Sequence, residues 1–547
     1  MRCTNSLRVD GTRQRECAMI LVAVVTFMCF MPCLHNGILR YDDEAYLLKS
    51  PFVLDASWRG LVETFAQPHL SNYQPLMLIV FRLLSDVFGF NPMLFHLVPV
   101  LLHVLNACLL SHILLQLGIR PWVAAPVTLI FSIHPLRVES VAWIYAGFGY
   151  TGASFFFLVA VSLYLKKNSE NRPTGMEKWL IPVVFALGLM WKIHVVVLPA
   201  ALLAIDFFLK RPAHSVLITE KTALFVLALL FVWVGLSAQL SGGAMEVGSR
   251  FLWWERPLNA AMALSYYALK TIWPTGLSVV VPYPTLEQTL RPSSYLPAFA
   301  LLSMGALSLA RMRRDRSLAF GLVWFLVCLL PALRLVPLGH SLVGDRYTYL
   351  AAAGLSVGVG GTLQSLQGSI LKRAVFVALW LALVPLGVLS WKHSQVWKND
   401  ISLWNHAVTV VPESVMLHIN LGLAYSEGGL IEEAEAALRT AQRLDPELTD
   451  TDVDLAFAKV YGQKGNFKEA IRYLNRALER EPDNMHAHVL LGVAWFGMED
   501  VEAARRSFEM VRFLGGEVPS QFREVLSQQP DANDAEQVRD GSLSDDL

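Results

Sequence analysis

Long apolar runs alternate with short polar stretches from about residue 19 to residue 391. Because about 20 apolar residues suffice for a helix to cross a membrane, this pattern predicts an all-α bundle of about 11–13 membrane segments. Two short runs, 122–133 and 258–273, are expected to be broken or half-membrane helices that line a protein cavity. The runs cover about 19–34, 75–89, 93–117, 122–133, 141–165, 179–208, 221–240, 258–273, 295–310, 318–336, 347–363 and 374–391.

A period of about 34 residues replaces this pattern beyond the proposed membrane domain, residues 18–391. Small, aromatic and proline residues recur where the paired helices of tetratricopeptide repeats have them, which predicts an α-solenoid that docks a partner protein. The first copy shows Leu421, Gly422, Tyr425, Ala434, Ala441 and Pro446. Within 392–518 we expect a half-repeat at about 396–414 and repeats at about 415–448, 451–484 and 485–518, followed by a disordered acidic tail at 519–547.

Composition agrees with a membrane protein. Of the 547 residues, 54% are hydrophobic and 16% are charged, and the mean hydropathy is +0.44. Because the net charge is zero, nothing favours a nucleic-acid partner. The six cysteines form no CxxC motif and no cluster with histidines, so we predict neither a disulfide framework nor a metal site, and any dependence on a divalent metal stays open.

Basic residues indicate which helix ends face the cytoplasm. Residues 1–17 carry four arginines, which predicts a cytoplasmic N-terminus and a retained first helix. A cleaved signal peptide is the alternative, but the exit Pro32-Cys33-Leu34-His35 lacks the small residues of a cleavage site. The loop 39–74, the loop 337–346 and the repeats would then be extracytoplasmic.

The middle of the chain does not obey simple alternation. Lys166-Lys167 and Lys210-Arg211 cannot both face the cytoplasm if each apolar run crosses the membrane once. We therefore expect at least one run in this region not to span.

Three consecutive carboxylates, Asp42, Asp43 and Glu44, follow the first apolar helix. Ionisable groups at the edge of the hydrocarbon are costly unless they face a polar cavity, so the default interpretation is a functional site. A solvated acidic loop is the alternative. Later in the same loop, residues 57–65 have the pattern of an interfacial amphipathic helix.

Other polar residues occur within or beside the apolar runs. Lys192 is the hardest to explain as packing, because an unpaired ammonium in hydrocarbon is expensive. Arg137 and Glu139 could pair locally and orient their loop, and Asp206 near Lys210 could mark a helix end. Packing against neighbouring helices is the favoured interpretation for Arg82, His96 and His103.

Several passages, in this order and with these spacings, resemble the transmembrane and tetratricopeptide-repeat protein O-mannosyltransferase family and its bacterial relatives, in the C-type glycosyltransferase superfamily. The resemblance extends over nearly the whole chain. It rests on Tyr41-Asp42-Asp43; Tyr73-Gln74-Pro75-Leu76 with Phe81-Arg82; Asn91-Pro92 with Phe95-His96-Leu97 and Leu102-His103; His134-Pro135 with Glu139 and Val141-Ala142-Trp143; Lys192, Pro199 and Asp206; Tyr266-Tyr267 with Pro274; and Asp345-Arg346-Tyr347 with Tyr349.

The resemblance implies transfer of a sugar, mannose or another hexose, from a polyprenyl- or dolichyl-phosphate donor to Ser/Thr hydroxyls at the extracytoplasmic face, with inversion. Asp43 is the expected base, with Asp42 or Glu44 orienting the acceptor or water. Lys192, Arg346 and Arg137 are expected to bind the donor phosphate. His134 is expected either to bind phosphate or a sugar hydroxyl or to cap the next helix. The remaining candidates for orienting or binding substrate are Glu139, Asp345, Tyr145 and Tyr150, and no metal ligand is assigned.

The sequence also departs from that family. Residues 144–150 lack the arginine and the acid that the relatives carry after Val141-Ala142-Trp143, Gln74 replaces an arginine, and Ile193 replaces an acid or proline. Tyr145 and Tyr150, with glycines at 147 and 149, could instead form a stacking platform for a sugar or prenyl chain.

These departures leave other functions open. An inactive relative that acts as a membrane-anchored scaffold is the main alternative, a transporter is weaker because no inverted repeat is evident, and a saccharide acceptor is not separable from a protein acceptor. The expected location is a multi-pass protein of a bacterial inner membrane, favoured over the endoplasmic reticulum, with site and repeats outside.

Overall fold

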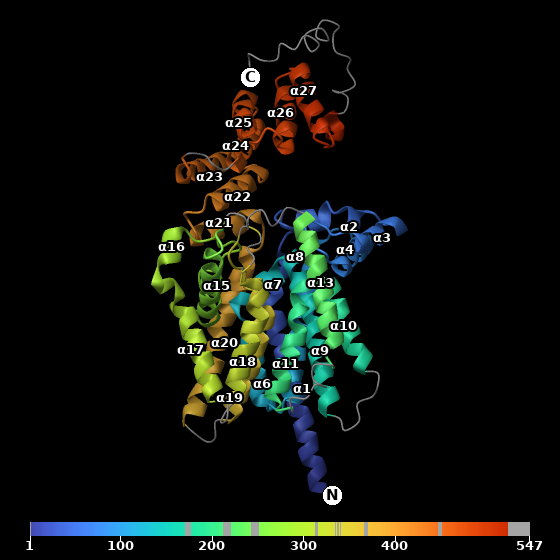
Figure 1. The fold of residues 1–547 in the computed structure, drawn as a ribbon, viewed down its shortest axis with the longest axis vertical. Coiled ribbons are helices and arrows are strands. Elements are labelled where there is room, and N and C mark those ends of the chain that lie inside the picture. Colours follow the sequence, from blue (N-terminus) through green and yellow to red (C-terminus); the bar gives the residue numbers. More distant parts are fainter. Residues whose placement is uncertain are drawn as a thin grey trace. The chain divides into compact units, whose positions relative to one another are not determined.

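The computed structural model describes residues 2–169, 177–211, 220–241, 251–311, 316–333, 335, 339, 341–365, 370–446 and 451–522 (Figure 1). Helices make up its regular structure, and within these ranges the only β pairings are the isolated bridges His69–Asn72 and Val281–Val343. The predicted all-α class is confirmed. The chain divides into two compact units, Met1–Leu403 and Trp404–Leu547. Arg313, Arg314 and most of the predicted acidic tail lie outside the described residues.

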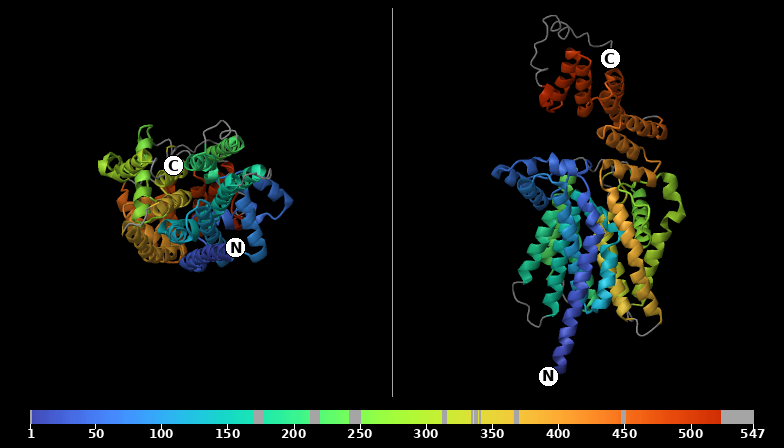
Figure 2. Two further views of the ribbon diagram at one scale, coloured as in Figure 1. Left: turned by 90° about the horizontal axis from the view of Figure 1, so that it is seen from below. Right: turned by 180° about the vertical axis from the view of Figure 1, so that it is seen from behind.

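The first unit is a bundle whose long helices run side by side, as both views in Figure 2 show. Short helices of the first polar loop cover one end of this bundle (Figure 1). The described helices are α1 (Arg2–Phe30), α2 (Pro51–Leu54), α3 (Trp58–Ala66), α4 (Pro75–Phe88), α5 (Pro92–Gln116), α6 (Pro121–Ser132), α7 (Glu139–Ala142), α8 (Ile144–Ala146), α9 (Gly152–Ser169), α10 (Glu177–Trp191), α11 (Leu198–Phe208), α13 (Thr222–Ser241), α15 (Glu255–Ile272), α16 (Leu286–Leu290), α17 (Leu296–Ala310), α18 (Ser317–Leu329), α19 (Thr348–Ser365) and α20 (Ile370–Val396).

Six helical stretches of the described chain are long and apolar enough to cross a membrane. Four shorter apolar helices of 10–17 residues accompany them in the first unit, among them the nearly fully buried α6. The chain is therefore a multi-pass membrane protein, whereas the expected number of 11–13 segments stays a prediction. The six stretches are Thr12–His35, Pro92–Gln116, Ile144–Lys167, Thr222–Leu240, Pro292–Ala310 and Arg373–Val396.

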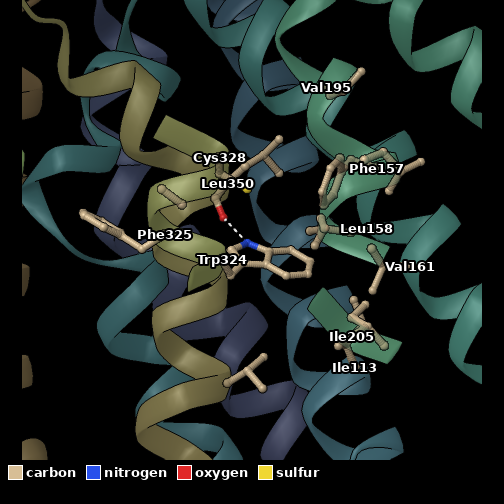
Figure 3. Close-up of a cluster of buried hydrophobic side chains, with 14 of the residues drawn as sticks. Ile113, Phe157, Leu158, Val161, Val195, Ile205, Trp324, Phe325, Cys328 and Leu350 are labelled. Carbon is tan, nitrogen blue, oxygen red and sulfur yellow. Dashed lines mark hydrogen bonds between the residues drawn. The ribbon is translucent and has the colours of Figure 1, made fainter. Parts of the chain in front are cut away.

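The core of the bundle forms where α18 and α19 approach closely. A Cβ atom on Gly321 would lie 2.9 Å from the Cα of Gly358, so the glycines allow the two backbones to touch. Next to this contact, the indole N–H of Trp324 donates to the Leu350 carbonyl at 2.9 Å, and Figure 3 shows its ring facing α9 and α11. Satisfying the one polar atom of this buried side chain lets the large ring fill the core.

The conflict in the positive-inside pattern disappears because the run 179–208 contains two helices, α10 and α11, separated at Lys192. Glu220 lies 3.8 Å from the Nζ of Lys167 and 3.3 Å from Nη1 of Arg211, so the ends of α9 and α11 meet. Arg316 donates to the Phe207 carbonyl at 3.1 Å at this same end. Basic residues on both sides of the run thus share one face of the bundle.

The short helix α3 presents an exposed apolar surface. Trp58, Val62 and Phe65 are spaced one turn apart and are 78%, 49% and 38% exposed. Gly60 and Thr64 are buried on the other side of the helix. This segregation agrees with the predicted interfacial helix.

The second unit consists of paired antiparallel helices. Small residues allow close packing within each pair: a Cβ on Gly422 would lie 2.8 Å from Leu438 Cγ, and one on Gly492 would lie 2.7 Å from Phe508 Cζ. Asp454 is fully buried between α24 and α25, where Arg476 and Arg480 pair with it. The helices are α22 (Val415–Glu427), α23 (Ile431–Leu444), α24 (Thr451–Gln463), α25 (Phe467–Arg480), α26 (Met485–Gly497) and α27 (Val501–Phe513), and α21 (Asp400–Val410) precedes them.

Candidate functional site

The acidic stretch lies in the polar segment between α1 and α2 and ends in a helical turn, Glu44–Leu48. Asp43 is 1% exposed, and its two carboxylate oxygens accept backbone N–H groups from Tyr145 at 2.7 Å and Leu39 at 3.3 Å. Burial raises the pKa of Asp43 to about 7, although both hydrogen bonds oppose this shift. Asp43 thus ties the acidic stretch to the segment after Trp143.

Asp42 has a different environment. Burial raises the pKa of its carboxyl group, while the positive charges of Arg346 and Lys192 lower it. These two cations come from segments more than 140 positions further along the chain. Of the two adjacent aspartates, Asp42 is therefore the one in the field of the predicted phosphate-binding residues.

Lys192 is an extended residue between α10 and the short turn Ile193–Val197. Its ammonium donates to the Tyr145 hydroxyl at 3.2 Å and to Oε1 of Gln74 at 3.4 Å, and it lies 4.3 Å and 5.1 Å from the ring centroids of Tyr145 and Tyr150. Its stem runs over Gly149, where a Cβ would lie only 2.9 Å from Lys192 Cδ. Cation–π contacts and neutral acceptors hold the ammonium without cancelling its charge.

Arg346 occupies the turn Asp345–Tyr347 just before α19. Its guanidinium forms an ion pair with Glu139, and its backbone N–H donates to the same carboxylate at 2.8 Å. The guanidinium also lies over the rings of Trp143 and Tyr347, at 5.4 Å and 4.8 Å. The partner of Glu139 is therefore Arg346, and the local pair with Arg137 is not formed.

A cavity of about 250 Å³ adjoins Lys192. Its lining combines polar residues, among them Asn72, Gln74, Lys192 and His194, with apolar residues that include Phe231 and Leu236 of α13. Within the described chain, Nδ1 of His194 has no hydrogen-bond partner. An amphiphilic ligand that carries an anionic group would match this mixture of a cation, polar groups and apolar side chains.

Three predicted site residues are directed elsewhere. Glu44 pairs with Lys49 at 2.9 Å. His134 accepts the Leu136 N–H at Nδ1, at 3.2 Å, and its Nε2 lies 3.2 Å from the Thr271 carbonyl, so it caps a turn, as one of the two interpretations expected. Arg137 is 1% exposed, donates to the Thr348 hydroxyl and lies 5.4 Å from the ring centroids of Phe131 and Tyr349.

The remaining candidates support the cluster. Asp345 is 2% exposed and accepts the Tyr266 hydroxyl at 2.9 Å. Burial and the neighbouring Glu139 raise the pKa of its carboxyl group. Tyr145 is stacked on Tyr46 at a centroid distance of 4.1 Å, and Tyr150 lies 4.6 Å from the ring of His194. Both tyrosines are buried around Lys192, so their rings are not an open stacking platform.

The buried histidines of α5 serve packing, as favoured from the sequence. His103 lies 2.6 Å from the Tyr349 hydroxyl at Nδ1 and 2.8 Å from the Ser132 carbonyl at Nε2. Nε2 of His96 lies 3.1 Å from the Gly37 carbonyl. These contacts satisfy polar groups inside the bundle and add nothing to the charged cluster.

Sequence reasoning missed the roles of several neutral residues. Gln74 was noted only as a lost arginine, yet it contacts both Lys192 and the Tyr145 hydroxyl, at 3.4 Å and 3.3 Å. Tyr46 and His194 carried no motif at all. Their only signal was proximity in sequence to Asp42 and Lys192. Within the described ranges, no group of three or more His, Cys, Asp or Glu residues could hold a metal ion.

Together, the fold and the site define a multi-pass membrane protein with a charged cluster and an amphiphilic cavity on one side of its bundle and helical repeats at its C-terminal side. The tetratricopeptide repeat family matches residues 417–448 and 455–517. This confirms the predicted repeats.

The curated proteins most similar to the chain confirm the resemblance seen in its sequence. A protein O-mannosyl-transferase of Caenorhabditis elegans is 23% identical over 81% of this chain and 64% of its own length. Protein O-mannosyl-transferase TMTC3 of Homo sapiens is 22% identical over 90% of this chain and 54% of its own length, and TMTC2 of Homo sapiens is 30% identical over 36% of this chain and 23% of its own length. The chain thus spans about half to two thirds of the first and second of these relatives and a quarter of the third.

Among solved structures, the chain is similar to ArnT from Cupriavidus metallidurans bound to undecaprenyl phosphate. The identity is 12%, and the match covers 82% of this chain and 78% of that chain with a TM-score of 0.36.

Proposed function

We propose that the chain is an integral-membrane glycosyltransferase that moves mannose or another hexose from a polyprenyl-phosphate donor to Ser/Thr hydroxyls of extracytoplasmic proteins. The observation that carries this proposal is Lys192, which lines a cavity with many apolar residues and whose charge, together with that of Arg346, acts on the carboxyl group of Asp42. A carboxylate base and phosphate-binding cations are the groups that this reaction requires.

Asp42 is the base in this proposal, and Asp43 is its support. The acceptor hydroxyl oxygen attacks the anomeric carbon while its proton passes to the Asp42 carboxylate. The bond from the anomeric carbon to the phosphate oxygen breaks, and the polyprenyl phosphate leaves with the electron pair. This single displacement inverts the anomeric centre. Asp43 is less suited to the proton transfer because both of its oxygens accept backbone N–H groups.

The donor phosphate binds between Lys192 and Arg346. The hydrogen-bond partners of the Lys192 ammonium are neutral, so a phosphate can become its counter-ion. Arg346 is oriented by Glu139, and its side chain is 16% exposed, so a phosphate oxygen can reach it. The prenyl chain lies along the apolar residues of the cavity, among them Phe231 and Leu236. This arrangement does not require the two charged residues that the related family carries in the segment 144–150.

The distribution of charge supports the proposed side of the membrane. Lys167, Arg211 and Arg316 gather at one end of the bundle, which the positive-inside rule places in the cytoplasm. Each connection from this end to Lys192 is a helix, α10 or α11, so the charged cluster belongs to the extracytoplasmic face. The repeats dock the acceptor protein and raise its local concentration. A bacterial inner membrane stays the favoured location.

A membrane-anchored scaffold without activity is the second candidate. The observation in its favour is the absence of any charged residue from 144–150, where the related family carries two. Under this alternative, Lys192 and Arg346 would only stabilise the bundle through their ion-pair and cation–π contacts.

The decisive experiment uses the purified full chain in lipid nanodiscs with polyprenyl-phosphate mannose and a Ser/Thr-rich acceptor protein, and measures glycopeptides by mass spectrometry. We expect transfer by the wild type, none by Asp42→Asn, and a reduced rate for Asp43→Asn. Asp55→Asn, an exposed aspartate of the same loop, is the matched control and should be active. If Asp42→Asn is active and Asp43→Asn is inactive, the base is Asp43. If the wild type transfers no hexose from mannose or glucose donors, the scaffold is the better account.

A further inference from the structure

Residues 394–400, which comprise the end of α20, the connection that follows it and the first residue of α21, bind the start of the acidic loop. The Asn36 amide donates to the Ser394 carbonyl at 3.1 Å, and the Gly37 N–H donates to the Lys398 carbonyl at 2.8 Å. The Arg40 N–H donates to the Asp400 carboxylate, at 3.1 Å and 3.3 Å from its two oxygens. Residues about 360 positions apart are thus joined directly before Tyr41 and Asp42.

Aromatic stacking continues this contact to the predicted phosphate-binding residues. Trp397 is 1% exposed and stacks on Trp143 with a centroid distance of 5.8 Å and an interplanar angle of 19°. Trp143 also packs against Tyr41, at 5.1 Å, and lies under the Arg346 guanidinium, at 5.4 Å. One indole therefore touches the segment 394–400, the acidic loop and Arg346.

We propose that Asp400 and Trp397 are positioning residues for the site: Asp400 holds the backbone that carries Asp42, and Trp397 holds Trp143 beneath Arg346. The inference rests on the proposed transferase function. It means that the segment leading into the repeats helps to assemble the active site. A base and a phosphate ligand must each be held within about half an ångström to act together, which requires such support.

The contacts of Asp400 are not explained by the start of helix α21. Asn399 already caps the start of this helix, because its side chain accepts the Ser402 N–H at 2.9 Å. The Asp400 carboxylate reaches instead to a backbone group on another part of the chain. Trp397 belongs to the connection between α20 and α21. Its side chain is buried, whereas that of the neighbouring Lys398 is exposed.

The test compares Asp400→Ala, Asp400→Asn, Trp397→Ala and Trp397→Phe in the full chain in nanodiscs. We expect Asp400→Ala and Trp397→Ala to lower kcat about tenfold and to change the KM values for donor and acceptor less than about twofold, because geometry and not binding is lost. Asp400→Asn keeps an acceptor oxygen and Trp397→Phe keeps a ring, so both should restore most of kcat. Thr285→Ala, which removes a side-chain cap from α16, is the matched control.

Hydrogen–deuterium exchange of peptides from residues 36–48 gives a readout that does not need activity. Asp400→Ala should speed exchange in this segment at least about threefold, and Thr285→Ala should leave it unchanged. Wild-type kcat and wild-type exchange in both alanine variants would overturn the inference, as would a loss of kcat that Asp400→Asn does not restore. If the wild-type chain transfers no sugar, the proposed function fails, while exchange still decides whether Asp400 holds the loop.

Discussion

The ammonium of Lys192 donates to the hydroxyl of Tyr145 at 3.2 Å, across 47 positions of sequence. Tyr145 in turn donates its backbone N–H to Asp43 at 2.7 Å. One tyrosine therefore links Lys192, a predicted phosphate-binding residue, to the acidic loop. Tyr145 stands in the segment that lacks the charges of the related family. A neutral hydroxyl and a ring there hold the lysine in place and leave its charge for a ligand.

The charge of Lys192 should be essential for donor binding. Lys192→Met keeps a flexible stem of similar length but removes the ammonium, so a donor phosphate would lose one of its two cations. We expect kcat/KM for the polyprenyl-phosphate donor to fall by about 10²–10³-fold, the range seen when a preorganised charge-stabilising group is removed. Initial rates at varied donor concentration measure this. A variant within about threefold of wild type would exclude Lys192 from phosphate binding.

The space over Gly149 should also matter for donor binding. Gly149→Ala places a methyl group about 2.9 Å from Lys192 Cδ, which forces the side chain away from Tyr145. We expect a loss of donor kcat/KM of about tenfold, smaller than for Lys192→Met because the charge stays nearby. Gly305→Ala, in α17, meets no atom within 4 Å and should behave as wild type. Equal activity of the two alanine variants would contradict the described packing.

The pH dependence of kcat/KM should report the ionisation of the proposed base, Asp42. Burial raises the pKa of Asp42 above its ordinary value and the two cations oppose it. A base must be ionised, so kcat/KM should fall as pH drops through this raised pKa, above the usual value of about 4. Arg346→Gln removes one cation, raises the pKa of Asp42 further and should move this acidic limb to higher pH. Rates measured from pH 4 to pH 9 test this. A limb that does not move would show that Arg346 does not act on the base.

Asp454 should stabilise the repeat unit without affecting chemistry. Asp454→Ala leaves Arg476 and Arg480 without their buried counter-ion. Removing one partner of a fully buried pair costs about 3–5 kcal/mol. We expect about 2 kcal/mol here, since these arginines are 32% and 31% exposed and can be hydrated. Limited proteolysis of the full chain should show faster cleavage within 451–522. Transfer to a free short peptide, which does not depend on docking, should be retained.

The helical class, the membrane character and the repeats could all be predicted from local patterns of residues. Runs of apolar residues have one satisfactory structure in hydrocarbon, because a helix pairs every backbone polar group internally. The small residues Gly422, Ala434 and Ala441 predicted paired helices for a similarly local reason, since packing of adjacent helices depends on neighbours along the chain. The acidic stretch, Lys192 and Arg346 were also recognisable as costly charges beside a membrane.

Which of these charges meet depends on how the helices pack and could not be predicted from local patterns. Glu139 pairs with Arg346, 207 positions away, and not with nearby Arg137, which is buried against aromatic rings. The two adjacent aspartates also differ in their surroundings: Asp43 accepts backbone N–H groups, whereas the carboxyl group of Asp42 experiences the charges of Arg346 and Lys192. The break of the run 179–208 at Lys192 was likewise hidden, since its residues are apolar on both sides. Apolar patterning sets which segments are helices, whereas the pairing of charges depends on how those helices pack, and that is a property of the whole bundle.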